Sequence, residues 1–140
     1  MIELTEIISR AVDIMNVGII LVDNDNQIVL HNKIAGEMFQ LIPEERIGTS
    51  ILRCHAEESV LKMIEKLRNG VIEKHEDWTN FKGRMMYMYT YPVRDDEGNY
   101  VGLVEDLHDA AEKAEHLKSK GMLEKVHVSG YDKKVPRNPK

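Results

Sequence analysis

Two turn-forming stretches late in the chain constrain its fold most, because they join three consecutive strand-like segments. These segments are Val71 to Trp78, Gly83 to Val93, and Tyr100 to Asp106. The connections between them are Asn80-Phe81-Lys82-Gly83 and Asp95-Asp96-Glu97-Gly98-Asn99. Short connections rich in Asn, Asp and Gly are hairpin signals. We therefore expect three antiparallel strands in succession, which excludes a sheet built from alternating parallel βαβ units.

A further hairpin is predicted near the start of the chain. Gly18 to Val22 is a compact apolar strand, Asp23 to Asn26 is a polar turn, and Gln27 to His31 is a second strand. Asn32 follows where a helix should begin, because its side chain can accept hydrogen bonds from the free backbone N–H groups of the first turn. That helix is predicted over Lys33 to Gln40.

Four more helical segments complete the pattern. Leu41 to Gly48 is predicted to form a short helical turn that begins near Pro43, and a longer helix is expected from about Ala56 to Arg68. The final helix is predicted over Leu107 to Lys118. The first helix, Leu4 to Met15, carries apolar side chains every three or four residues, at Leu4, Ile7, Ile8, Ala11, Val12 and Met15. Such a stripe packs either on the chain's own sheet or on a second subunit.

The element order predicts an α+β fold with a five-stranded antiparallel sheet and short helices gathered on one face. With 140 residues, of which 42% are hydrophobic, the chain can bury a single core. We divide it into an amphipathic helix over residues 1–17, a core over residues 18–110, and a C-terminal helix with a basic tail over residues 111–140.

The charge and the cysteine content of the chain limit its possible binding partners and its cellular compartment. The net charge of −5, with basic residues crowded into the C-terminal tail, argues against nucleic-acid binding by the acidic body. Cys54 is the single cysteine, which favours a reducing compartment. The first residues carry acids where a secretory signal has positive charge, and no apolar run approaches the roughly 20 residues of a membrane span. We expect a cytoplasmic protein that is not in a membrane.

The ordered set of motifs resembles the PAS domain family from Met15 to about Ala110. Gly18 to Asn32 is similar to the family's opening hairpin, and Asn32 matches the family's helix-capping Asn. Ala35 to Phe39 resembles the first short helix, and Tyr91 to Asp106 the closing hairpin. The resemblance implies a sensory domain that binds a ligand between sheet and helices and signals to a partner protein. Because no output domain follows, it implies a stand-alone sensor or a fragment of a longer chain.

The resemblance also implies a cofactor candidate. In haem-binding PAS domains an imidazole comes from the region of His55, although this histidine lies about one helical turn earlier than usual when counted back from Gly70. A thioether can serve as a second axial ligand. We therefore predict a site, with His55 as the metal ligand, formed by His55, Val60, Leu61, Ile64, Met86 and Met88. Strand alternation places Met86 and Met88 on one face and Met85, Tyr87, Tyr89 and Tyr91 on the other. Both methionines also suit a soft, adaptable pocket wall without iron.

Three other interpretations stay open or are set aside. Flavin photochemistry is set aside, because the stretch that corresponds to the family's flavin-binding cysteine motif, Gly48 to Leu52, has no thiol and Cys54 is displaced by three residues. An enzyme that uses Cys54 and His55 is an alternative, but the chain has no nucleophile elbow, phosphate loop or paired metal-ligand motif. A ligand-free interaction module is the other alternative. The resemblance also favours a homodimer that pairs through the first helix.

Overall fold

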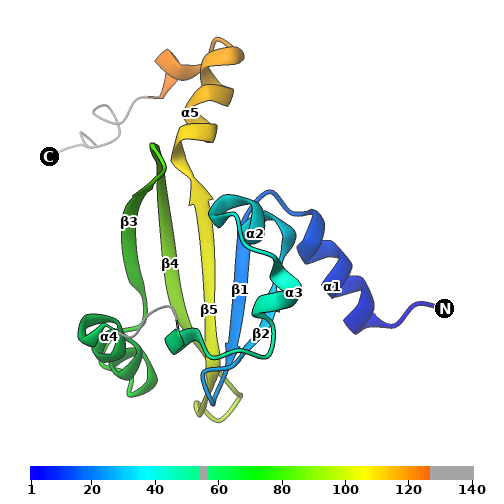
Figure 1. Ribbon diagram of the computed structural model, residues 1–140, viewed down its shortest axis with the longest axis vertical. Coiled ribbons are helices and arrows are strands. Elements are labelled where there is room, and N and C mark those ends of the chain that lie inside the picture. The colour runs from blue at the N-terminus through cyan, green and yellow to red at the C-terminus, as the bar shows by residue number, and fades with distance from the viewer. Residues whose placement is uncertain (54–56, 127–140) are drawn as a thin grey trace, which may run out of the picture. The chain divides into compact units, whose positions relative to one another are not determined.

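The computed structural model describes residues 1–53 and 57–126 (Figure 1). The chain divides into two compact units, Met1–Asp109 and Ala110–Lys140. The first unit contains α1 (Leu4–Ile14), β1 (Gly18–Asp23), β2 (Ile28–His31), α2 (Lys33–Phe39), α3 (Pro43–Arg46), the 3₁₀ turn η1 (Ile51–Arg53), α4 (Glu58–Arg68), β3 (His75–Phe81), β4 (Arg84–Arg94) and β5 (Tyr100–Asp109). In the second unit, α5 (Ala110–Ser119) is followed by a short 3₁₀ turn, η2 (Leu123–Lys125).

The five strands form one antiparallel sheet in the order β2-β1-β5-β4-β3. All three predicted hairpins are present, and β5 closes the sheet by pairing with β1 as well as with β4. The β3–β4 turn consists of Lys82 and Gly83, with φ of 52° and 86°. Two successive positive φ values are typical of a tight hairpin turn that matches the twist of its strands. The predicted α+β fold with a five-stranded antiparallel sheet is confirmed.

The predicted bounds of β3 and β5 were wrong, and β3 ends at Phe81 rather than at Trp78. β3 begins at His75 rather than Val71, because the backbone N–H groups of Val71 and Ile72 both hydrogen-bond to the Lys66 carbonyl, at 2.9 and 3.3 Å, and so finish the end of α4. β5 continues to Asp109, whereas the sequence predicted that the strand ends at Asp106 and that a helix starts at Leu107. Leu107 lies opposite Gly18 and Met88 and is only 2% exposed, so the core holds this segment in the sheet.

Asn32 joins three elements of the fold. Its Oδ1 accepts hydrogen bonds from the backbone N–H groups of Ala35, at 3.0 Å, and Ile19, at 2.8 Å. Its Nδ2 donates to the carbonyls of Val12 and Val17, both at 2.8 Å. The predicted capping role is confirmed, and the same side chain also ties the end of α1 to the start of β1.

The core lies between the inner face of the sheet and the helices that cover it, α2, α3 and α4 (Figure 1). Ile20, Val22, Leu103 and Leu107 come from the sheet, while Ile64 and Leu67 come from α4. Alternate strand residues point to opposite faces, so this apolar inner row has an outer counterpart. No helix among the described residues is both long and apolar enough to cross a lipid bilayer.

The outer face of the sheet carries stacked aromatic rings. The Tyr87 ring lies between those of Trp78 and His108, with centroid separations of 4.7 and 4.6 Å. Tyr89 contacts Tyr87 edge-on at 6.0 Å. We call Trp78, Tyr87, Tyr89 and His108 the aromatic face. Met86, in contrast, is 3% exposed in the core, as strand alternation predicts.

Candidate functional site

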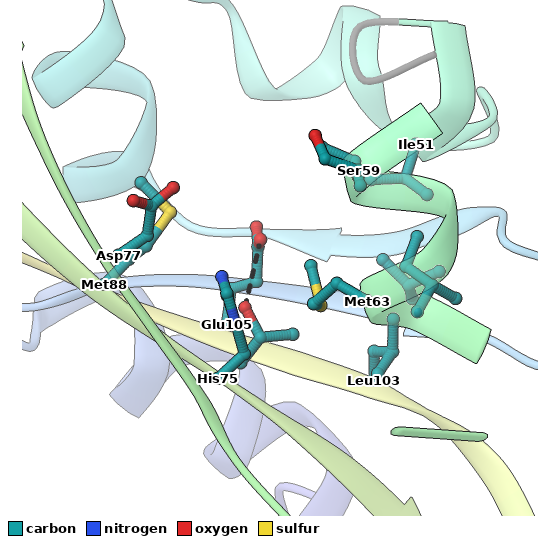
Figure 2. Close-up of a pocket in the computed structure, with 12 residues that line it drawn as sticks. Ile51, Ser59, Met63, His75, Asp77, Met88, Leu103 and Glu105 are labelled. Atoms are coloured by element: carbon teal, nitrogen blue, oxygen red, sulfur yellow. Dashed lines mark hydrogen bonds between the residues drawn. The ribbon is translucent and has the colours of Figure 1, made fainter. Parts of the chain in front are cut away.

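A cavity of about 260 Å³ lies between α4 and the inner face of the sheet (Figure 2). α4 contributes Val60, Met63 and Ile64, because these residues recur on the helix face that points toward the sheet. The opposite wall comes mainly from β1, β4 and β5, through Val22, Met88 and Leu103. We call this space the α4 cavity. Its walls are predominantly apolar, which is typical of small-molecule sites.

The carboxyl of Glu105 is the main polar group in the α4 cavity. Figure 2 shows its side chain among the lining residues, between Asp77 and Met63 in this view. The Thr90 hydroxyl donates a long hydrogen bond of 3.5 Å to Glu105 Oε2. Burial raises the pKa of Glu105 from 4.5 to about 7, and the bond from Thr90 offsets only part of that effect. A carboxylate with one weak partner in an apolar cavity retains most of its capacity to accept hydrogen bonds.

Three more polar side chains line the α4 cavity: Ser59 at the start of α4, and His75 and Asp77 on β3. Ser59 and Asp77 are exposed residues, so they lie where the cavity meets the surface. Thr90, by contrast, is only 2% exposed. The cavity therefore has two carboxyl groups, that of the exposed Asp77 near its opening and that of the half-buried Glu105 beside Thr90.

A second cavity, of about 400 Å³, adjoins the first. Both cavities are lined by Ile51, Asp77, Met88 and Glu105, so these residues stand between them. We call the second space the α2 cavity, because Phe39 of α2 lies in its wall, edge to face with Phe81 at 5.3 Å. The two cavities together are called the hollow below.

His31 and Arg46 give the α2 cavity a different polar character. His31 is 5% exposed, and its burial lowers the pKa of its imidazole, while the positive charge of Arg46 lowers it further. The ring is therefore neutral at physiological pH, and Arg46 carries the positive charge of this cavity.

Only some of the predicted site residues lie together in the structure. Val60, Ile64 and Met88 line the α4 cavity. Leu61 is 42% exposed and Met86 is packed in the core, and neither belongs to the described lining of either cavity. His55 lies outside the described residues, as does Cys54. A role in binding a cofactor stays a prediction for all six residues of the predicted site.

The sequence analysis missed Glu105, Thr90, Asp77 and His75. A signal for Glu105 was present, since period-two alternation along β5 puts it on the same face as Leu103 and Leu107, both of which are core residues. An acid in the middle of an inward-facing apolar row is unusual, and ionisable groups in such surroundings mark candidate sites.

Comparisons with known proteins agree on the fold. The sequence profile of a family described as "PAS domain" matches residues 10–110. A C-terminal domain from Streptococcus mutans superposes with a TM-score of 0.64 at 25% identity, over 79% of this chain and 88% of that one. The PAS domain of Bordetella pertussis BvgS gives a TM-score of 0.61 at 19% identity, over 84% and 92%.

A sensory box sensor histidine kinase from Vibrio cholerae superposes with a TM-score of 0.52 at 16% identity, over 76% of this chain and 91% of that one. At this level of identity the likeness concerns the fold. No curated protein matches the sequence.

Proposed function

This chain belongs to the PAS domain family, and we propose that it is a sensory domain that binds a small molecule in the hollow and relays the event to a partner protein. The observation that carries the proposal is the apolar α4 cavity with the carboxyl of Glu105 in its lining, where burial raises the pKa of this acid to about 7. Placing a carboxyl among apolar walls is unfavourable for folding when, among the described residues, it receives only the long hydrogen bond from Thr90. Groups of this kind cluster at functional sites, because a ligand can supply the missing partner.

Chain continuity supports a route for the signal. Glu105 lies on β5, which ends at Asp109, and α5 begins at the next residue, Ala110. A ligand that changes the position of the Glu105 side chain acts on the strand that leads directly into α5. The competing function is an interaction module with no ligand, and a hollow that takes up no small molecule would favour it.

Haem remains a predicted occupant. The described lining offers side chains of the kinds that ligate haem iron, the Met88 thioether and the imidazoles of His31 and His75. The predicted iron ligand itself, His55, lies outside the described residues. Haem would supply redox or gas-binding chemistry, whereas the apolar walls around Met88 would exclude water.

Filling the α4 cavity tests the proposal. We expect Val60→Trp to weaken binding of the uncharged dye N-phenyl-1-naphthylamine by about tenfold or more, because the indole occupies space that the dye needs. Leu61→Trp is the matched control, since Leu61 is 42% exposed on the same helix and does not line the described cavity. Dye fluorescence titrations give both dissociation constants.

The unmodified chain should take up the dye, and Leu61→Trp should behave like it. A dye that binds equally well to both tryptophan variants occupies another surface, and a dye that does not bind the unmodified chain leaves the interaction module as the better proposal. Mass spectrometry of the purified protein under native conditions then identifies any molecule that it carries from the cell.

We also propose that the chain forms a homodimer through α1. Its apolar residues are exposed rather than packed on the sheet, with Leu4 71%, Ile7 45% and Ile8 51% exposed. Pairing the same stripe of two copies would remove this apolar surface from water in an isologous contact.

Light scattering at micromolar concentration tests the dimer. We expect the unmodified chain to have the mass of two copies and Ile8→Glu to have the mass of one, because a charge in an apolar contact is strongly unfavourable. Ser9→Glu, a neighbouring exposed position outside the apolar stripe, should stay dimeric. An unmodified chain with the mass of a single copy would contradict the proposal.

A further inference from the structure

We propose that the natural ligand is a small organic cation, an amine on an aromatic or aliphatic body, whose nitrogen pairs with Glu105 while its body packs against the apolar face of α4. This inference rests on the proposed sensory function and deepens it, since it names the chemical class of the ligand. Three observations support it: the charges around the α4 cavity, the free hydrogen-bonding capacity of Glu105, and the form of the cavity walls.

The charges of the α4 cavity favour a cation. Its described lining contains two carboxyl groups, Glu105 and Asp77, and no Lys or Arg side chain. An anionic ligand would meet both carboxyl groups and no Lys or Arg side chain in the described lining. A cation would pass the exposed Asp77 at the opening and then neutralise the charge of Glu105. The positive charge of Arg46 lies in the wall of the other cavity, which places the amine on the α4 side.

Glu105 has unused capacity to accept hydrogen bonds. An ionised carboxylate offers about four lone-pair sites, and the hydroxyl of Thr90 uses one of them at 3.5 Å. A protonated amine carries N–H donors that can fill the others. Hydrogen bonds between an ammonium and a carboxylate are shorter and stronger than neutral ones.

The raised pKa of Glu105 couples the ionisation of this carboxyl to the binding of an amine. With a pKa of about 7, this group is roughly half ionised at neutral pH. A neighbouring positive charge favours the ionised form. Binding of an amine therefore changes Glu105 from a partly protonated group into a fully ionised one, and this change of charge takes place on β5.

The walls of the α4 cavity limit the size of the ligand and the chemistry of its apolar body. A volume of about 260 Å³ accommodates one small ring system with a short side chain. Met63 on α4 and Met88 on β4 face this space with thioether groups. Thioethers adapt to irregular shapes and make favourable contacts with aromatic rings, so an arylalkylamine fits both the walls and the carboxyl.

Three indoles of matched shape test the inference at pH 7.5 by displacement of N-phenyl-1-naphthylamine. Tryptamine is the cation, 3-ethylindole the neutral analogue and indole-3-propionate the anion. We expect tryptamine to bind about tenfold or more tightly than 3-ethylindole, because it adds a charge-assisted hydrogen bond to the same apolar contact. Indole-3-propionate should bind most weakly.

Two variants assign the preference to Glu105. In Glu105→Gln the advantage of tryptamine over 3-ethylindole should disappear, while 3-ethylindole itself binds as before. Glu76→Gln is the control, because it removes a negative charge from β3 on the opposite face, where Glu76 accepts a hydrogen bond of 2.6 Å from the Trp78 indole. This variant should retain the preference for tryptamine.

The outcomes separate this inference from the function on which it rests. If the dye binds but tryptamine has no advantage, the preference for a cation is wrong. If tryptamine keeps its advantage in Glu105→Gln, the pairing with Glu105 is wrong. In both cases the sensory hollow remains. If the dye does not bind the unmodified chain at all, both proposals are wrong.

Discussion

Replacing Glu105 with Gln is expected to raise the free energy of unfolding at pH 8 by about 2 to 3 kcal/mol. The pKa of this group is about 7 in the folded chain, against an ordinary value of 4.5. Each unit of difference corresponds to about 1.4 kcal/mol, and part of the side chain faces the hollow, where solvent screening reduces the effect. Gln has nearly the same shape and can still accept the bond from Thr90, so the variant removes mainly the charge.

The dependence on pH follows from the direction of the shift. Because the folded chain holds the proton more tightly than the unfolded chain, the contribution of Glu105 to stability is fully present below the ordinary pKa of 4.5. It is lost as the pH rises from there to about 7, and it is constant above that value. The stabilisation by Glu105→Gln should therefore be largest at alkaline pH and shrink to less than about 1 kcal/mol near pH 5.

Urea unfolding followed by far-ultraviolet circular dichroism from pH 5 to pH 8 measures this effect. Glu76→Gln provides the baseline, because it removes an exposed carboxylate from the outer side of the sheet. If the unmodified chain and Glu105→Gln lose stability in parallel as the pH rises, the buried carboxyl does not titrate in this range and its role in the site must be reconsidered.

Asn32→Ala should lower the free energy of unfolding by about 3 to 4 kcal/mol. The side chain is 1% exposed and makes four hydrogen bonds to backbone groups of Val12, Val17, Ile19 and Ala35. Loss of a capping side chain alone lowers stability by about 1 to 2 kcal/mol. The remaining loss arises because Ala leaves three further backbone groups without their partner, away from bulk water.

Thermal and urea unfolding of two companion variants isolates this effect. Asn32→Asp keeps both acceptor bonds and loses the two bonds donated by Nδ2, so its stability should lie between those of the unmodified chain and Asn32→Ala. Asn16→Ala, at an exposed position just after α1, should change stability by less than about 0.5 kcal/mol. Equal effects of the substitutions at positions 16 and 32 would contradict the bridging role of Asn32.

Local signals determined most of the fold that could be predicted from the sequence. Asn32 was identified as a cap because its chemistry acts within three residues, and the hairpins were identified because Gly and Asn adopt the backbone angles that tight turns require. Errors occurred where contacts with residues far away in the sequence determine the secondary structure. The segment from Leu107 to Asp109 has a helix-like composition around it, but pairing with β1 and β4 keeps it in the sheet.

The candidate site was harder to predict for the same reason. The sequence placed Met88, Val60 and Ile64 on the correct faces of their elements, because alternation and helical periodicity are local properties. It gave weight to His55, as a recognisable ligand type, and overlooked Glu105, whose importance depends on the burial that α4 and three strands impose together. Thr90 could be linked to Glu105 only through the pairing of β4 with β5, in which the two residues lie opposite each other.

The alternation along β5 has one more consequence. Glu105 points into the hollow, whereas the next residue, Asp106, points to the other side, where its Oδ1 lies 3.1 Å from Nε2 of His108 in the aromatic face. The interior and the exterior of the domain are thus separated by one peptide unit. The sheet is one backbone layer thick. A strand that shifts when a ligand binds in the hollow therefore also moves the rings of the aromatic face, which a partner protein would contact.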